Sequence, residues 1–490
     1  MKVSLTVFLF FASLILTSCS AWRNSEKENK DTLRLFPSAE LRSDLEFLVK
    51  NSQEVHPSLY SAVDSITFTS SVKKVMDSLN HSMTRLEFYR LAAPLLSLLK
   101  NGHSCIFLPG VEWESYLEHG GRSFPYRVSF DSEGGLKVKE SCDSSSRVMP
   151  GARIVAINGL EADSLFNAFK TYRGGESEKW QNNVASEWFK RYLWLNKILA
   201  PYEITFRANG REMKLKTDGI ARSRTPSQPA VTYKEPYTFE MLPGNIGYMN
   251  YLSMESNDVS NPFGAFLEKV FSELKAKEAS GLIIDLRQNG GGNAKYGYML
   301  LNYLAEKPFR MHSMKAWKAS AQYKDYMRSR IPWWLSWVSY RPAIWIAGLF
   351  SEYADMFTAK DGEVLKFYTA EEIPEDNPLR FQIKVCFLIG TGTYSSAMLL
   401  ANAVSDYKLA CLIGEETGGI PNEFGEVYYF RLPNTQLMVS MPSALFVRAN
   451  GNCSDRRGVL PDIEVKRKPM DTERQSDTVL EAARNWILNN

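Results

Sequence analysis

The first part of the chain carries apolar residues at helical spacing over residues 38–100. Thr84 followed by Glu87 forms a capping box, which predicts that a helix begins there. Pro94 falls inside this helix, at a point where the helix can kink. The pattern predicts an N-terminal helical domain over residues 38–110.

Residues 120–218 change to short alternating segments separated by Gly and Asp turns, which predict a β-rich module. Within VMPGARIVAINGLEADSLF (148–166) we expect a strand at 153–157, a turn at Asn158-Gly159 and a short helix. This order resembles the carboxylate-binding half of a PDZ domain. Any small β-rich module with an Asn-Gly hairpin is the alternative.

From about residue 240 to 470, apolar strands alternate with helical stretches, a pattern typical of a layered α/β sheet. The expected strands are 246–252, 281–286 and 383–389. An amphipathic helix is expected at the C-terminus, over residues 476–490.

The N-terminus has the pattern of an export signal. Lys2 precedes a short apolar run, and residues 1–18 end in small residues, as secretory signals do. The sequence Leu-Thr-Ser-Cys ending at Cys19 resembles a bacterial lipobox, in which Cys19 is lipidated and becomes the first residue. Each buried acyl CH₂ adds about 0.8 kcal/mol of membrane affinity. An ordinary signal peptide with an incidental cysteine is the alternative.

Residues 19–37 are polar and predict a tether between the N-terminal anchor and the folded part of the chain.

Composition narrows the function classes. Of the 490 residues, 44% are hydrophobic and 23% charged, which is ordinary for globular proteins, and the length predicts two or three domains. The net charge of +3 and the lack of a dense basic stretch argue against a nucleic-acid partner. The cysteines after Cys19 show no paired spacing, so the sequence predicts neither a disulfide framework nor a zinc site. Cys386 and Cys411 are expected to be free buried thiols.

The segment GLIIDLRQNGGGN (281–293) is the strongest chemical signal. A buried strand runs into Gly290, Gly291 and Gly292, and exposed backbone N–H groups there suit an oxyanion hole or a phosphate nest. No Gly-Lys-Ser/Thr follows, and the spacing does not match the dinucleotide motif. A purely structural glycine turn remains the alternative.

A second segment, IKVCFLIGTGTYSSAMLLANAV (383–404), places Ser395 and Ser396 where a strand turns into a helix. A serine at such a turn is exposed, and the helix N-terminus favours developing negative charge. No histidine follows His312 in the chain, so the residue order of α/β-hydrolases is excluded for Ser395. A simple Ser-Ser helix cap is the alternative.

The candidate base is His103, in a Gly-flanked turn of LLKNGHSCIFL (98–108). His56 is its rival, and a lone histidine is more often structural than catalytic.

Together, DLRQNGGG, TYSSA and GHS resemble the C-terminal processing (tail-specific) serine peptidases, in particular the Ser-His branch related to tricorn protease. The segments GEETGGIPNEFGEV (414–427) and GVLPDIEV (458–465) resemble the same family. This resemblance implies an α/β fold: a crotonase-like (ClpP-like) spiral core with an N-terminal helical cap and a PDZ-like module.

The resemblance also implies roles for single residues. Ser395 matches the nucleophile and His103 its base, and the oxyanion hole would combine the Ser396 amide with an amide of Gly290 or Gly291. The Ser-Lys branch carries a lysine in the loop after the serine, but here TGGIPNEFG (417–425) has none, which shifts the base to His103. Activity should then fall with acid near the imidazole pKa, about 6–7. Glu423 and Glu426 lie in the loop from which a group could orient His103, and exposed strand carboxylates without this role are the favoured alternative.

The resemblance is interrupted by an insertion at about 310–375. In this chain 102 residues separate Gly292 from Ser395, roughly twice the spacing that the family resemblance implies. Its Trp-rich part, 333–350, is broken by Arg341 and Pro342 and is too irregular to span a bilayer. Buried core or a lid over the cleft is expected, and contact with a membrane interface is the alternative.

These inferences predict a serine endopeptidase that needs no metal or organic cofactor and cleaves exported polypeptides. Its predicted location is the bacterial cell envelope (periplasm or outer membrane), with a lipid anchor at Cys19. The alternative is a catalytically inactive peptide-binding lipoprotein of the same fold.

Overall fold

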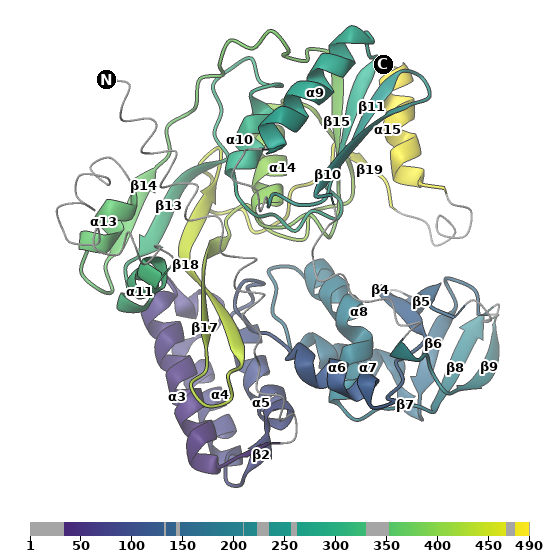
Figure 1. The fold of residues 1–490 in the computed structure, drawn as a ribbon, viewed down its shortest axis with the longest axis vertical. Helices are drawn as coiled ribbons and strands as arrows, with labels where there is room; N and C mark the ends of the chain where they lie inside the picture. Colours follow the sequence, from purple (N-terminus) through teal and green to yellow (C-terminus); the bar gives the residue numbers. More distant parts are fainter. Residues whose placement is uncertain are drawn as a thin grey trace.

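The computed structural model describes residues 34–131, 134–143, 148–208, 210–222, 235–255, 262–329, 352–466 and 476–489. The predicted signal peptide, Cys19 and the Trp-rich run 333–350 lie outside these described residues. Within them the protein is a mixed α/β structure built around three larger sheets (Figure 1).

The first sheet forms the centre of the C-terminal half. Its order is β10 (Tyr237–Leu242), β11 (Ile246–Tyr251), β12 (Gly281–Asp285), β15 (Lys384–Ile389), β16 (Cys411–Gly414) and β19 (Ile463–Glu464). All neighbouring pairs are parallel except β10 with β11. The three strands expected from the apolar runs are therefore neighbours in one sheet.

This sheet is covered on both faces, because its strands alternate their side chains between two apolar clusters. Leu282 and Ile284 of β12 face the cluster with α9 (Pro262–Ala276), α10 (Lys295–Leu301) and α14 (Ser396–Tyr407). Ile283 faces the opposite side, where Ile487 of the C-terminal helix α15 (Thr478–Asn489) packs. Cys386 and Cys411 are cross-strand neighbours and are free thiols, as predicted; Cys386 is buried as expected, but Cys411 is only half-buried because it lies at the start of its strand.

The second sheet contains β14 (Val364–Tyr368), β13 (His312–Lys318), β18 (Met438–Arg448) and β17 (Phe424–Arg431), and the short β3 (Cys105–Ile106) pairs with β18. The predicted insertion supplies β13 and β14, together with α11 (Ala321–Ser329) and α13 (Glu352–Thr358). The described part of the insertion thus extends this sheet.

The N-terminal helices are α3 (Ser38–Val55), α4 (Ser65–Ser78) and α5 (Arg85–Ser97), with a 3-10 turn at Leu59–Ser61. The two-residue strands β1 (Leu35–Phe36) and β2 (Met83–Thr84) pair beside them. The predicted capping box of Thr84 and Glu87 is present, and α5 continues through Pro94. The long β17–β18 hairpin reaches down among these helices (Figure 1). The buried Asp44 of α3 accepts hydrogen bonds from the backbone N–H groups of Asn434 and Thr435 at its tip, both 2.8 Å.

The third sheet contains β4 (Tyr126–Asp131), β5 (Gly135–Ser141), β6 (Arg153–Ile157), β8 (Tyr202–Ala208) and β9 (Arg211–Thr217), and β7 (Leu160–Glu161) pairs with β6. The predicted strand and its Asn158-Gly159 turn are present, with φ of 49° and 79° at the turn. Three helices accompany this sheet: α6 (Gly110–Glu118), α7 (Ala162–Lys170) and α8 (Glu178–Leu195). In Figure 1, α8 lies on the side of this sheet that faces the rest of the molecule.

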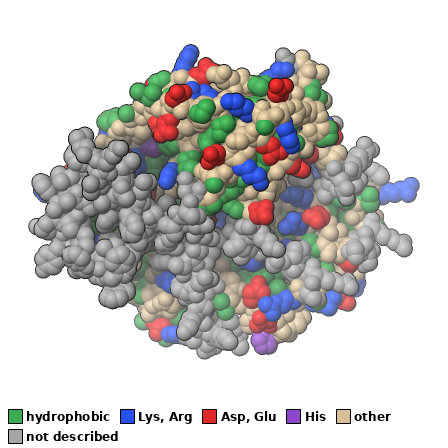
Figure 2. Space-filling model, turned by 45° about the horizontal axis from the view of Figure 1, so that its top comes forward, with side chains coloured by type: hydrophobic (Ala, Val, Ile, Leu, Met, Phe, Trp, Pro, Cys, Tyr) green, Lys and Arg blue, Asp and Glu red, His purple; other side chains and the backbone are tan. Residues whose placement is uncertain are grey.

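On the face drawn in Figure 2, basic and acidic side chains are interspersed over the described surface. None of the helices formed by described residues has both the length and the apolar character that crossing a bilayer requires.

Candidate active site

The two glycine and serine motifs meet because the strands before them are adjacent and parallel. β12 leads into Gly290–Gly292 and β15 leads into Ser395, and parallel neighbours end at the same edge of a sheet. The Ser396 hydroxyl donates to the carbonyl oxygen of Gly292 (2.7 Å), and the Tyr394 N–H donates to that of Asn289 (3.0 Å). These bonds hold the serine turn against the glycine loop.

Ser395 has φ 52° and ψ −132°, a combination that side-chain-bearing residues rarely adopt. It stands directly before α14, whose first helical residue is Ser396. Its hydroxyl is therefore presented beside the N-terminus of a helix of twelve residues, where backbone N–H groups and the helix dipole favour negative charge.

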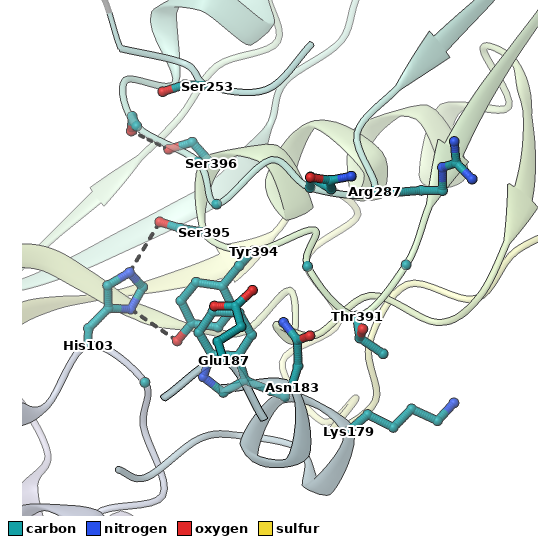
Figure 3. A pocket seen from close by; sticks show the side chains of 18 of the residues that line it. His103, Lys179, Asn183, Glu187, Ser253, Arg287, Thr391, Tyr394, Ser395 and Ser396 are labelled. Carbon is teal, nitrogen blue, oxygen red and sulfur yellow. Dashed lines mark hydrogen bonds between the residues drawn. The ribbon is translucent and has the colours of Figure 1, made fainter. Parts of the chain in front are cut away.

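His103 reaches Ser395 from the other end of the chain. The turn that carries it lies between α5 and β3, and β3 is fixed by pairing Cys105 and Ile106 with β18. His103 Nε2 lies 3.2 Å from Ser395 Oγ, within reach for direct proton transfer (Figure 3). The structure thus brings together the predicted nucleophile and the predicted base.

The other ring nitrogen of His103 faces the side chain of Tyr394. Nδ1 lies 3.4 Å from the Tyr394 hydroxyl oxygen. The Tyr394 hydroxyl proton is directed to Glu176, at 2.9 and 3.0 Å from its two carboxylate oxygens. Since the Tyr394 oxygen then offers a lone pair to Nδ1, the proton of the neutral imidazole belongs on Nδ1. Nε2 is then free to accept the proton of Ser395.

The pKa of His103 differs from the sequence-based expectation. Burial and, less strongly, the positive charge of Arg173 lower the pKa from its ordinary value of 6.5 to about 4, and a hydrogen bond to the Phe424 backbone opposes the shift. For this geometry the acid limb of activity is therefore expected at a lower pH than the 6–7 predicted from the sequence, because the sequence did not reveal how deeply the ring is buried.

The glycine loop departs from one expectation. The Gly291 N–H donates to the side-chain oxygen of Asn289 (2.9 Å), so in this conformation it is not available to an oxyanion. Gly290 lines the cavity, and a Cβ built there would meet no atom within 4 Å. The Ser396 N–H lies at the open end of α14. Ser396 and Gly290 therefore remain the candidates for oxyanion donors, and Gly291 serves another purpose: a Cβ there would lie 2.8 Å from both Ser395 Cβ and the Ser396 nitrogen.

Glu423, considered as the group that orients His103, has no recorded hydrogen bond with the ring. It is 2% exposed, its Oε2 has no partner among the described residues, and burial, with Glu176 nearby, raises its pKa well above the usual range. Burial therefore favours the uncharged form of this carboxyl group, which makes it a poor counter-ion for His103. The rival histidine, His56, packs on the Phe424 ring (4.5 Å between centroids), and burial lowers its pKa to about 3.

Sequence reasoning missed three residues around the base. Tyr394, Glu176 and Trp180 form one group, in which the rings of Tyr394 and Trp180 stack at 3.9 Å and 7°. The glycine pair before Glu176, Gly174-Gly175, is the only sequence signal that marks this loop. A Cβ on Gly175 would overlap the ring of Trp180.

Ser395 opens into a cavity of about 1850 Å³. It is lined by the serine turn, the glycine loop, β17, β18, β4 and α8, and the α8 side chains of Lys179, Asn183 and Glu187 lie near the site in Figure 3. Among the described residues, no group of three or more His, Cys, Asp or Glu side chains could hold a metal ion. The chemistry available at this site is that of a serine, an imidazole and backbone amides.

Comparison with known proteins assigns part of the chain to a family. Residues 245–465, which carry the glycine loop and Ser395, match the sequence model of peptidase family S41. This part of the chain is a serine-type peptidase domain of family S41. The match confirms the family expected from the motifs.

Solved structures resemble this chain over nearly its whole length. Mature CPAF complexed with lactacystin has a TM-score of 0.63 at 15% identity, covering 92% of this chain and 99% of that chain. A second structure of mature CPAF gives a TM-score of 0.61 at 16% identity, covering 92% and 96%. The photosystem II D1 C-terminal processing protease gives 0.41 at 16% identity, covering 87% and 93%. At such identities the CPAF likeness establishes the fold alone.

The glycine loop gives a matched pair of substitutions. Gly291→Ala should lower kcat/KM by about 10²–10³, because its Cβ displaces the Ser395 turn and with it the Ser396 N–H, the candidate oxyanion donor, and because its φ of 97° disfavours alanine. Gly290→Ala should cost less than about tenfold, since its Cβ enters open space and its N–H remains. Peptide hydrolysis measured beside thermal unfolding separates the two. Equal activities in two folded variants would contradict the steric role of Gly291.

The pH profile follows from the burial of His103. The base form exists above its pKa, so the limb of kcat/KM that reports His103 should lie near pH 4, and not at 6–7. The rate at which a fluorophosphonate labels Ser395, measured from pH 3 to 9, reads this limb without a peptide substrate. A single full inflection at the ordinary histidine pKa would contradict the buried environment described above.

Proposed function

We propose that the protein is an exported endopeptidase in which Ser395 attacks the substrate and His103 is its general base. The observation that carries this proposal is the 3.2 Å contact between His103 Nε2 and Ser395 Oγ at a strained turn before a helix. The S41 match supplies the substrate class, polypeptides.

In the proposed reaction, His103 Nε2 takes the hydroxyl proton while Ser395 Oγ forms a bond to the scissile carbonyl carbon. The resulting oxyanion is stabilised by the Ser396 N–H and a glycine-loop amide. His103 then gives the proton to the leaving amine as the C–N bond breaks. Water deacylates the enzyme by the same steps, passing one proton through His103 and back to Ser395.

The loop in which the Ser-Lys branch carries its lysine supports a histidine base. Here the segment 417–425 contains no lysine, and Gly418 and Gly419 donate backbone hydrogen bonds to the Thr393 carbonyl, at 3.1 and 3.5 Å. The loop therefore packs against the serine turn as backbone, and no amine from it competes with His103.

We also propose the finer architecture expected from the family. The parallel β11–β12–β15–β16 sheet with helices between its strands supports a crotonase-like core. Helices α3–α5 would be the N-terminal cap. The β6–β7–α7 unit, with its Asn158-Gly159 turn, supports a PDZ-like module.

The proposed location is the bacterial cell envelope, through a lipid on Cys19. The support is the sequence alone: an apolar run that ends in Leu-Thr-Ser-Cys, followed by a polar tether.

Two neighbouring serines test the catalytic proposal. Ser395→Ala should abolish hydrolysis of an unfolded polypeptide and fluorophosphonate labelling, because it removes the nucleophile. Ser396→Ala should keep most activity, since it loses only the 2.7 Å bond to Gly292 and retains its backbone N–H.

If Ser396→Ala is inactive and Ser395→Ala active, the nucleophile is wrongly assigned. If the wild type neither cleaves nor labels but binds peptides, the binding-module alternative holds. Cleavage of esters alone would indicate a different acyl substrate.

The anchor is tested by Cys19→Ser in the full chain. The substitution removes the only thiol of the lipobox, so the protein should be released from membranes or accumulate as an uncleaved precursor. Membrane fractionation and the mass of the mature N-terminus measure this outcome, with Cys453→Ser as the control. Unchanged membrane retention at the wild-type mature mass would contradict lipidation at Cys19.

A further inference from the structure

Glu176 lies close to the base but outside the cavity lining. It follows Gly174-Gly175 in the segment between α7 and α8, one residue before Ser177, whose side chain caps α8. A carboxylate placed here does not contact the substrate space, so any influence on catalysis must pass through its neighbours.

One set of Glu176 contacts holds the turn that carries His103. Glu176 Oε1 accepts from Asn101 Nδ2 (2.8 Å) and from the Gly102 N–H (3.3 Å). Asn101 in turn accepts from the backbone N–H of His103 (3.0 Å) through its side-chain oxygen. The backbone on the N-terminal side of His103 is thus bound to a single carboxylate.

The second set of contacts acts on the imidazole ring. The Tyr394 hydroxyl donates to Glu176, and its oxygen lies 3.4 Å from His103 Nδ1. Burial raises the pKa of Tyr394 well above 10, so its hydroxyl keeps its proton. Were Glu176 absent, this hydroxyl could turn its proton toward Nδ1 and favour the tautomer with the proton on Nε2, which cannot accept from Ser395.

We propose that Glu176 is the positioning residue of the catalytic histidine, acting through Tyr394 on the ring and through Asn101 on the turn. The inference rests on the Ser395–His103 mechanism proposed above. Its new element is that the third member of the catalytic group comes from the loop before α8, which belongs to the β-rich part of the chain.

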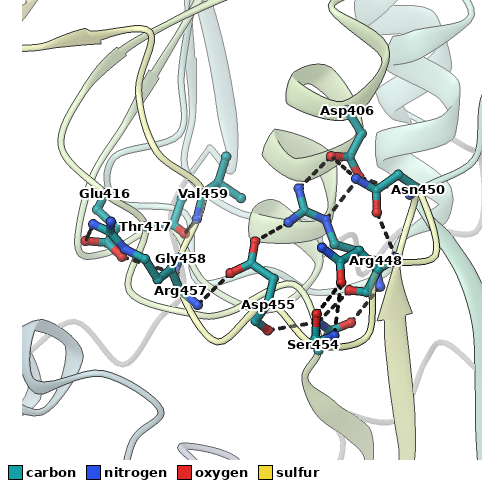
Figure 4. A network of polar contacts seen from close by, with 12 residues as sticks. Asp406, Glu416, Thr417, Arg448, Asn450, Ser454, Asp455, Arg457, Gly458 and Val459 are labelled. Atoms are coloured by element: carbon teal, nitrogen blue, oxygen red, sulfur yellow. Dashed lines mark hydrogen bonds and ion pairs between the residues drawn. The ribbon is translucent and has the colours of Figure 1, made fainter.

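The loop is held in place by contacts with the loop after β16. The Ser177 hydroxyl donates to the carbonyl of Gly418 (2.8 Å), and Lys179 pairs with Glu416 (3.2 Å). Glu416 also pairs with Arg457 (3.5 Å) and accepts from the N–H of Gly458 (3.1 Å), as Figure 4 shows. Glu176 therefore reaches His103 only while α8 is docked on the peptidase domain.

The groups around Glu176 determine when it is charged. Tyr394 donates to it, the carboxyl group of Glu423 lies nearby, and the positive charge of Arg173 acts on both Tyr394 and His103. Burial raises the pKa of Glu176 to about 7, although its hydrogen-bond donors oppose the shift. Its positioning contacts should therefore be strongest above neutral pH, where it is an acceptor only.

Kinetics of Glu176→Gln and Tyr394→Phe at about pH 8.5 test the inference, since Glu176 is ionised there. Both substitutions keep the shape of the residue, and Tyr394→Phe also keeps the stacking on Trp180. Each should lower kcat and the fluorophosphonate labelling rate about 10- to 100-fold, the effect of misplacing a reacting group by about 1 Å, with KM changed less than about threefold. The double variant should lose little more than either single one, because the two residues act in series. The wild type should show a step in kcat/KM near pH 7, comparable in size to the effect of Glu176→Gln, that Glu176→Gln lacks, while the His103 limb remains near pH 4 in both.

The matched controls are Tyr407→Phe and Glu371→Gln. Tyr407 donates to Glu371 (2.7 Å) in a tyrosine–glutamate pair at the other end of α14, and both variants should keep wild-type kcat.

NMR of isotope-labelled histidine in the Ser395→Ala protein reads the His103 tautomer without activity. The proton should be on Nδ1, and should shift toward Nε2 when Tyr394→Phe or Glu176→Ala is added. Wild-type kcat in both folded Tyr394 and Glu176 variants, or an unchanged tautomer, overturns the positioning role. If Ser395→Ala is inactive but the Glu176 and Tyr394 variants keep wild-type kcat, the positioning role is wrong and the Ser-His mechanism stands. If the wild type is inactive but the tautomer shifts as expected, the peptidase proposal is wrong and the positioning role stands.

Discussion

The active site depends on one contact between residues that lie 292 positions apart, His103 and Ser395. Ser395 is placed by the end of β15 in the parallel sheet, and His103 by the pairing of β3 with β18 in the second sheet. A shift of either sheet against the other by about 1 Å would separate the two atoms beyond hydrogen-bond reach. The position of the second sheet relative to the first is therefore a requirement of the proposed chemistry, since it sets the distance over which the proton moves.

Burial around this contact acts in opposite directions on acids and bases. It lowers the pKa of His103 to about 4 and raises that of Glu176 to about 7, because both side chains are more stable uncharged in a low-dielectric environment. A base with a lowered pKa is present in its active form at every moderately acidic pH, but it accepts a proton less readily. The negative charge of Glu176, transmitted through Tyr394, would stabilise the imidazolium that forms on proton transfer and would partly offset this weakness.

The sequence reveals those parts of the site that are encoded locally. Gly290–Gly292 and Ser395 each follow an apolar strand, and the adjacency of β12 and β15 brings them together as predicted. Glu176 could not be found this way, because its partners Gly102 and Tyr394 are 74 and 218 residues away and no periodic pattern connects them. For the same reason Glu423 was considered in its place: it lies in the expected loop, but only the structure reveals that its carboxyl group is buried without a recorded bond to the imidazole.

Gly102 illustrates how closely the three parts of the chain approach one another at the base. A Cβ on this residue would overlap the Tyr394 hydroxyl and lie 2.6 Å from Trp180 Nε1, so only glycine leaves room for both. Tyr394 comes from the serine turn and Trp180 from α8, whereas Gly102 precedes His103 after α5. The glycine of the GHS motif is therefore required by steric contact between separate elements and not by backbone conformation. The absence of a side chain at Gly102 also lets Glu176 come close enough to accept a hydrogen bond from the Gly102 N–H. A larger residue at this position would therefore disturb the contact by which the β-rich part of the chain reaches the catalytic histidine.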